Sequence, residues 1–322
     1  MLLNSSPKCF SVSSVVLTVY FFLAVTIGAQ TAPASYALIP DNPRPGEPVT
    51  IGVRNGAGAK SAVLMVEGKR LTRAAFFSVS AENDSDGGKQ SFMAAVLTVP
   101  ATVKPGSRAV IAVEAAGGII REITVAIAGR EFISEVIELN PTLTGIRTEP
   151  DPRKTAEADH LWSILNRTGA DSYHFGAFSP PVSSTRRTSF FGDRRVYQYS
   201  NGNNDISIHA GIDYGVPKGT AVNACGQGKV VLARNRIVTG NSVIIEHLPG
   251  VYSLYYHLDT IEVAEGALVN AGALLGLSGA TGLATGPHLH WEIRVSGENT
   301  DPDAFIARPI LDKEAILDKI YP

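Results

Sequence analysis

The chain has 322 residues, of which 44% are hydrophobic, 18% are charged and 31 are glycine. This length allows two domains with sizeable cores, and the composition is that of a globular, mainly β protein. The formal net charge of −2, without a basic stripe anywhere, gives no reason to expect a nucleic-acid partner.

The first 29 residues have the pattern of an export signal. Lys8 supplies a positive charge, residues 15–27 form an uncharged apolar run, and Ile27-Gly28-Ala29 offers a cleavage site. The alternative is an uncleaved membrane anchor, since the run is only slightly shorter than the roughly 20 residues that span a bilayer. We expect an exported protein of the periplasm or cell envelope, which meets the membrane only through this segment if it stays uncleaved.

Residues 30–129 alternate between apolar and polar side chains in several short runs. Val49, Ile51 and Val53 form one such run. Glu67-Gly68 and Gly117-Gly118 stand between runs and are typical of two-residue hairpin turns. We expect a small β-sandwich of immunoglobulin-like type. The block contains no histidine, so we expect it to position or to inhibit a catalytic domain, and the sequence does not decide between these roles.

Residues 130–189 have the character of a linker with one helix. Asp151 is placed to cap that helix, Pro152 occupies its first position, and Gly169 ends it. Apolar side chains recur at helical spacing at Ala158, Leu161, Trp162 and Leu165. His160 and His174 are expected to be surface or packing residues.

Cys225 is the single cysteine that remains after removal of the first 29 residues. An internal disulfide is therefore excluded in the mature chain. Cys225 stands in a predicted strand and is expected to be a small buried residue. A papain-like nucleophile would have to be exposed and paired with a histidine.

Residues 190–310 are rich in short strands and glycine, and residues 311–322 are expected to form a C-terminal helix. One strand, at residues 285–295, carries two histidines. Alternation places Leu289, Trp291, Ile293 and Val295 on one face, and His288, His290, Glu292 and Arg294 on the other. We expect a half-buried strand with its polar face outward, where two imidazoles can converge on one ion or one water.

Two upstream segments offer partners for these imidazoles. His209 and Asp213 are four residues apart, but the nearby Gly211 makes a helix unfavourable. A fully extended strand would separate the two by roughly 13 Å, so the chain must bend near Gly211 if they are to meet. His257 ends the second strand of a hairpin predicted to turn at Pro249-Gly250, whereas His247 is expected to have a structural role.

His209, Asp213 and one histidine of the His288/His290 pair would supply two nitrogens and one oxygen. Three protein ligands with an open fourth position are the arrangement of a catalytic zinc site, whereas structural zinc sites are closed. Mixed nitrogen and oxygen ligands suit Zn²⁺ better than Mg²⁺ or Ca²⁺, which prefer oxygen.

These motifs, together with their order, resemble the lysostaphin/LytM-type zinc endopeptidases that cut peptidoglycan. The resemblance extends from about residue 191 to residue 302 and includes His209-x-x-x-Asp213, Tyr256-His257-Leu258 and Gly286-Pro287-His288-Leu289-His290-Trp291. It implies an antiparallel β-sheet metallopeptidase domain in which His209, Asp213 and His290 hold the zinc. It also implies that His257 and His288 act on the water and on the developing oxyanion.

The function expected from this resemblance is hydrolysis of peptide cross-bridges in peptidoglycan by a metal-activated water. One alternative is a catalytically silent module that binds the wall or activates another hydrolase. The other is a zinc D,D-carboxypeptidase or amidase on the same substrate. Which cross-bridge bond is cut stays open, as does which of His257 and His288 is the base. Because all candidate site residues lie in the C-terminal half, we expect residues 175–310 to fold and cut alone.

Overall fold

The structure is a computed structural model that describes residues 36–321, apart from Asn55, Ala57, residues 81–90, Thr168 and Ala170. The expected export signal lies outside the described residues. No helix of the described part is long and apolar enough to cross a bilayer. The described chain is mainly β, as the sequence predicted, and contains four helices, of which two were predicted.

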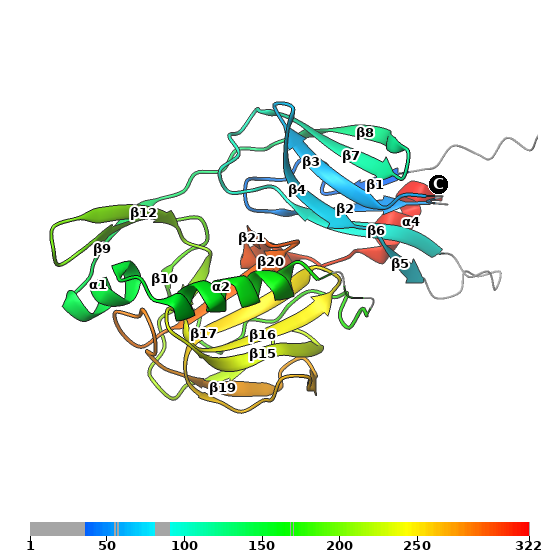
Figure 1. Cartoon of the computed structure of the whole chain (residues 1–322). Helices are drawn as coiled ribbons and strands as arrows, with labels where there is room; N and C mark the ends of the chain where they lie inside the picture. The colour runs from blue at the N-terminus through cyan, green and yellow to red at the C-terminus, as the bar shows by residue number, and fades with distance from the viewer. Residues whose placement is uncertain are drawn as a thin grey trace, which may run out of the picture. The chain divides into compact units, whose positions relative to one another are not determined.

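The N-terminal half forms two four-stranded antiparallel sheets (Figure 1). The first has the order β1 (Tyr36–Ile39), β2 (Pro48–Val53), β6 (Ser91–Thr98), β5 (Phe77–Ser80). The second has the order β4 (Lys69–Ala75), β3 (Ser61–Val66), β7 (Arg108–Ala115), β8 (Gly118–Ala126). Ile51 and Leu97 from the first sheet and Leu64 and Ile111 from the second are fully buried in one shared core.

Both hairpins predicted in this half are confirmed, although the second turns at Ala116-Gly117, one residue before the predicted Gly117-Gly118. Glu67 and Gly68 connect β3 to β4 with positive φ angles of 48° and 75°, the backbone that a two-residue hairpin turn requires. Gly118 begins β8 opposite Ala115 and has a φ of 119°. Glycine adopts such angles without a steric penalty, which explains its place at these turns.

The segment between the halves contains more structure than the predicted linker with one helix. It comprises β9 (Ser134–Glu138), α1 (Pro141–Thr148) and α2 (Pro152–Leu165). The predicted helix is α2, and Asp151 caps it by accepting a hydrogen bond from the Arg153 N–H. The unpredicted helix α1 begins at a proline after Asn140, whose side chain accepts from the Leu143 N–H. Only eight residues long and interrupted by a glycine, it shows too little periodicity to be recognised from the sequence.

The C-terminal half is built on a ten-stranded antiparallel sheet. Its main path runs β10 (Arg187–Ser189), β13 (Gly211–Tyr214), β20 (Leu289–Val295), β17 (Val251–Ile261), β16 (Gly240–Leu248), β15 (Gly228–Arg236), β18 (Leu268–Val269). Beside this path lie β14 (Ala221–Asn223), β19 (Leu274–Ser278) and β21 (Glu298–Thr300). Helix α2 lies across this sheet (Figure 1), with Ile164 and Leu165 buried against Tyr252 and Leu254.

A three-stranded sheet stands next to the main sheet. It has the order β12 (Asn204–Ile208), β11 (Arg194–Gln198), β9. Strand β9 pairs with β11 in parallel, so a strand from the connecting segment completes a sheet of the C-terminal half. The chain ends with α3 (Pro302–Ala307) and α4 (Lys313–Ile320), and the predicted C-terminal helix corresponds to α4. Helix α4 contacts the first sheet, where Lys319 donates to the Leu38 carbonyl.

Candidate metal centre

Two neighbouring strands and one bend bring the predicted ligands together. Asp213 on β13 stands directly opposite His290 on β20 in the antiparallel register. His209 lies in the bend between β12 and β13, where its N–H and carbonyl bond to the backbone of Asp193 and Gly192. The predicted bend near Gly211 is thus confirmed: it brings the Nε2 of His209 within 3.3 Å of the Oδ1 of Asp213.

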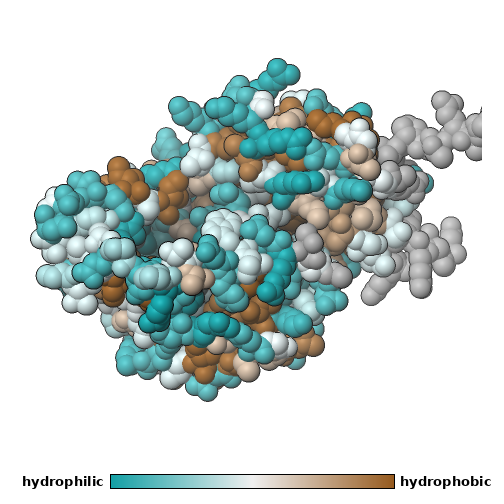
Figure 2. Space-filling view, in the orientation of Figure 1, coloured by the Kyte–Doolittle hydropathy of each residue, from teal (hydrophilic) through white to brown (hydrophobic). Residues whose placement is uncertain are grey.

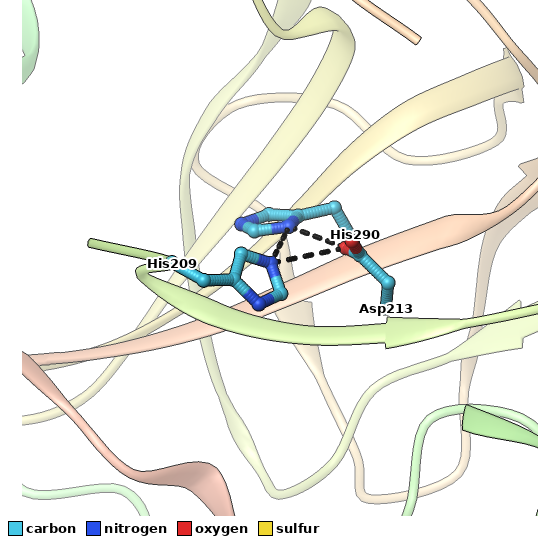
Figure 3. A group of neighbouring side chains, drawn as sticks. All are labelled: His209, Asp213 and His290. Carbon is cyan, nitrogen blue, oxygen red and sulfur yellow. Dashed lines mark hydrogen bonds and ion pairs between the residues drawn. The ribbon is translucent and has the colours of Figure 1, made fainter. Parts of the chain in front are cut away.

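Three ligand-type atoms converge at this point (Figure 3). The Nδ1 of His290 lies 2.7 Å from the Oδ1 of Asp213 and 3.0 Å from the Nε2 of His209. Zinc bonds of about 2.0–2.1 Å at tetrahedral angles would separate the ligand atoms by roughly 3.3 Å, so the cluster accommodates an ion after moving apart by a few tenths of an ångström. All three side chains are at least nine-tenths buried.

The outer ring nitrogens fix the tautomers of these ligands. His209 presents Nδ1 to the Phe190 carbonyl at 2.8 Å, and His290 presents Nε2 to the Glu292 carboxylate at 2.9 Å. An N–H at each outer position leaves the inner nitrogen with a lone pair for a metal. The donor set is therefore prepared for an ion by its surroundings, and it fits a metal held by two imidazoles and one carboxylate.

His257 and His288 stand beside this set without joining it. Their rings are 4.8 Å apart, and each Nδ1 faces a backbone carbonyl, that of Thr281 for His257 and that of Gly286 for His288. Each therefore keeps the Nε2 lone pair free, and the Nε2 of His288 is 3.8 Å from the Oδ1 of Asp213. His257 has a φ of 61°, an unusual backbone for a histidine, and such outliers cluster at functional sites.

The histidines of the site differ in their protonation state at pH 7. Burial, together with repulsion from the neighbouring imidazoles, lowers the pKa of His257 to about 3. Burial also lowers the pKa of His288, so both are neutral at pH 7. His290 is different: burial opposes its charge, but attraction to Asp213 and hydrogen bonds to Asp213 and Glu292 outweigh this and raise its pKa to about 9. Without a metal, a protonated His290 and an ionised Asp213 form a buried pair.

The polar face of β20 does not point to solvent, contrary to the prediction. His290 and Glu292 are buried, and Arg294 is only partly exposed. The charges are tolerated because Glu292 bonds to both neighbours, with 2.9 Å to His290 and 2.8 Å to Arg294. Burial raises the pKa of Glu292, but attraction to Arg294 outweighs this and holds it at about 2.

The site opens into a cleft of about 510 Å³. The three-stranded sheet contributes Glu135, Arg195 and Tyr197 to its lining. Residues 283–288 also line it, together with Val238 and Thr239. The five predicted site residues all line this cleft, so the structure brings together every candidate that the sequence identified.

The sequence did not single out four residues that support these five, three by direct contact and one through Arg195. They are Glu292, which bonds to His290; Tyr256, whose ring stacks on His290 at 5.7 Å; Arg195, which bonds to Asp213; and Glu135, which bonds to Arg195. Glu292 could have been found, because its place two residues after His290 puts it on the same strand face. Glu135 carries no such signal, since it lies 60 residues before Arg195 in the chain.

The remaining histidines and the cysteine lie apart from the five site residues. His247 is fully buried, with ring nitrogens facing the Gln227 carbonyl and the Ser253 hydroxyl. Cys225 is buried as expected, and burial raises the pKa of its thiol to about 12, which excludes a reactive thiolate. His174 stacks on Phe178, in keeping with a packing role.

Comparison with known proteins agrees with this geometry. A model of peptidase family M23 matches residues 207–302. The DD-carboxypeptidase/endopeptidase Mpg of Neisseria meningitidis is 39% identical over 122 residues, which make up 38% of this chain and 27% of the relative. The peptidoglycan DD-endopeptidase ShyA of Vibrio cholerae is 41% identical over 118 residues, 37% of this chain and 27% of the relative. The chain thus covers only about a quarter of these relatives.

A solved structure extends the likeness beyond the matched segment. The crystal structure of a peptidase M23 protein from Pseudomonas aeruginosa is 25% identical, with a TM-score of 0.54, and the match covers 82% of this chain and 94% of that one. The resemblance that the sequence motifs indicated is therefore confirmed for residues 207–302, which match peptidase family M23.

Proposed function

We propose that this chain is an exported zinc-dependent endopeptidase that hydrolyses peptide cross-bridges of peptidoglycan. The observation that carries the proposal is the convergence of ligand atoms from His209, Asp213 and His290 in an open cleft. The family match and the peptidoglycan DD-endopeptidase relatives support the substrate class. The apolar run at residues 15–27 supports export.

His209, Asp213 and His290 would hold the ion, and Asp213 would offset one of its two charges. Zinc bound there would polarise a peptide carbonyl and make water acidic near neutral pH. His257 and His288 are neutral at pH 7 and keep Nε2 free, so each can accept a proton there. We assign to this pair the removal of the proton from the attacking water and the protonation of the leaving amine.

The N-terminal half is proposed to be immunoglobulin-like. Its strand orders, β1-β2-β6-β5 and β4-β3-β7-β8, support this, because renaming the strands A, B, C, C′, D, E, F and G along the chain gives A-B-E-D and C′-C-F-G. We propose that it positions the catalytic half on its substrate.

Digestion of purified muropeptides tests the proposed function. The full-length chain with zinc should convert cross-linked dimers to monomers, and a chelator should stop the conversion. A carboxypeptidase would instead shorten the peptides of monomers and leave dimers linked. A silent binding or activating module would change neither substrate, even with zinc bound. Mass analysis of the products separates the three cases.

A further inference from the structure

The second oxygen of the proposed ligand Asp213 is occupied by the protein. Oδ1 faces the histidines, whereas Oδ2 receives a hydrogen bond of 2.5 Å from the Nη2 of Arg195. Both side chains are nearly buried, at 9% exposed for Asp213 and 11% for Arg195. A charge-assisted bond in such a place fixes the carboxylate plane, so Asp213 presents one oxygen to an ion rather than two.

The charge of Arg195 is in turn compensated by a second carboxylate. Its Nε donates to the Oε1 of Glu135 at 2.5 Å, and the Ser189 hydroxyl donates to the same oxygen at 2.7 Å. Glu135 stands directly across from Arg195 in the parallel pairing of β9 with β11. The guanidinium thus bridges two carboxylates. Burial opposes its charge, but its interactions with Asp213 and Glu135 outweigh burial and raise the pKa of Arg195.

The bridge places Arg195 beside the metal site without changing the net charge there. A divalent ion with the Asp213 carboxylate has a net charge of about +1, and Arg195 with Glu135 adds nothing to it. Loss of Glu135 would leave an uncompensated guanidinium beside the ion, where the interior screens charges weakly. Loss of Arg195 would free Oδ2 and leave Glu135 without its partner, close to an already anionic ligand.

We propose that Arg195 and Glu135 are positioning residues for the metal centre, and that β9 is a working part of the catalytic unit. Arg195 and Glu135 both precede the segment matched by the family model, residues 207–302, and Glu135 comes from the connecting segment before α1. The inference rests on the proposed metal centre and adds that its affinity for zinc depends on this bridge.

The test measures zinc affinity of the full-length chain by competition with a chelator of known affinity. Arg195→Gln should weaken zinc binding by roughly 10- to 100-fold, the usual effect of a lost partner behind a metal ligand. Arg195→Lys keeps the charge but cannot donate to two carboxylates in the same geometry. Its zinc affinity should therefore lie between those of the wild type and of Arg195→Gln. Glu135→Gln should weaken zinc binding less than Arg195→Gln but measurably.

Glu138→Gln is the matched control, since it removes the same charge from the same strand at an exposed position. It should bind zinc like the wild type. Thermal melts of each zinc-free variant check folding. If Arg195→Gln fails to fold, Glu135→Gln still tests the proposal, because the Glu135 side chain is 26% exposed and its replacement should leave the fold intact. Equal zinc affinity for Glu135→Gln and Glu138→Gln would overturn the proposal. A wild-type chain that binds no zinc would instead refute the metal centre itself.

Discussion

At the scale of single side chains, His288, which directly precedes β20, and His290 on β20 present different ring nitrogens to the cleft. Nδ1 of His290 lies among the ligand atoms, 2.7 Å from the Oδ1 of Asp213, whereas the Nδ1 of His288 faces a carbonyl and its Nε2 stays free. Their spacing in the sequence predicts that both approach the site. Only the resemblance to a family distinguished their roles, and the hydrogen bonds now give that distinction a physical basis.

Removal of each histidine should therefore have a different effect. His290→Ala should purify with little zinc, because one of three ligand atoms is lost. His288→Ala should keep zinc near the wild-type level while the rate on peptidoglycan falls about 10²–10⁴-fold, the scale of a general acid–base contribution. Metal analysis and turnover assays check both, with His160→Ala on helix α2 as a control that changes neither. The assignment fails if His288→Ala loses the metal and His290→Ala retains it.

The raised pKa of His290 predicts that zinc binding releases a proton. In the metal-free chain the imidazole is charged below its pKa of about 9, and a metal can bind Nδ1 only after that proton leaves. Apparent zinc affinity should therefore rise about tenfold per pH unit between pH 7 and pH 8 and level off above pH 9. Calorimetry in buffers of different ionisation enthalpy measures the released proton. An affinity that does not change between pH 7 and pH 8 would contradict a protonated His290.

At the scale of elements, the alternation in β20 correctly predicted the buried apolar face but not that the polar face is also largely buried. A strand with one polar face usually turns it to water. Here Glu292 sits between His290 and Arg294, which compensates its charge and permits burial. Such compensation depends on side-chain contacts that the hydrophobic pattern does not encode. The pairing of β9 with β11 was unpredictable for a related reason, since it joins distant segments.

At Gly211, the first residue of β13, a single added methyl group should disrupt the site. A Cβ there would lie 2.1 Å from the carbonyl oxygen of Trp291, in the backbone of the neighbouring strand. Gly211→Ala should therefore push β13 away from β20, lower the free energy of unfolding by about 2–4 kcal/mol and weaken zinc binding.

Denaturant unfolding of the zinc-free protein measures the loss of stability. Gly129→Ala is the matched control, because a Cβ at residue 129 would meet no atom within 4 Å. Equal stability of the two variants would show that β13 can shift without cost.

At the scale of the whole molecule, we propose that the catalytic unit extends beyond the expected residues 175–310. The site residues do lie within residues 175–310, but β9 and α2 pack on this part from outside it. Ile164 and Leu165 are each 1% exposed, and burial of one such side chain contributes roughly 1.5–3 kcal/mol. The sequence revealed α2 but not the surface that it covers.

Two fragments test this revision. A fragment of residues 130–322 should melt at a higher temperature and bind zinc more tightly than one of residues 175–322, because it retains β9, Glu135 and α2. Differential scanning calorimetry with and without zinc compares them. If the shorter fragment matches the longer one in both measurements, the connecting segment is a linker, as the sequence alone suggested.

The central claim is that His209, Asp213 and His290 form a zinc centre with one open position. X-ray absorption at the zinc edge tests it most directly on the zinc-loaded full-length chain. We predict about one zinc per chain with about four light ligands near 2.0–2.1 Å, two of them imidazoles, and loss of this signal in His290→Ala. Zinc that is absent, or that stays bound in His290→Ala with the same ligands, would contradict the claim.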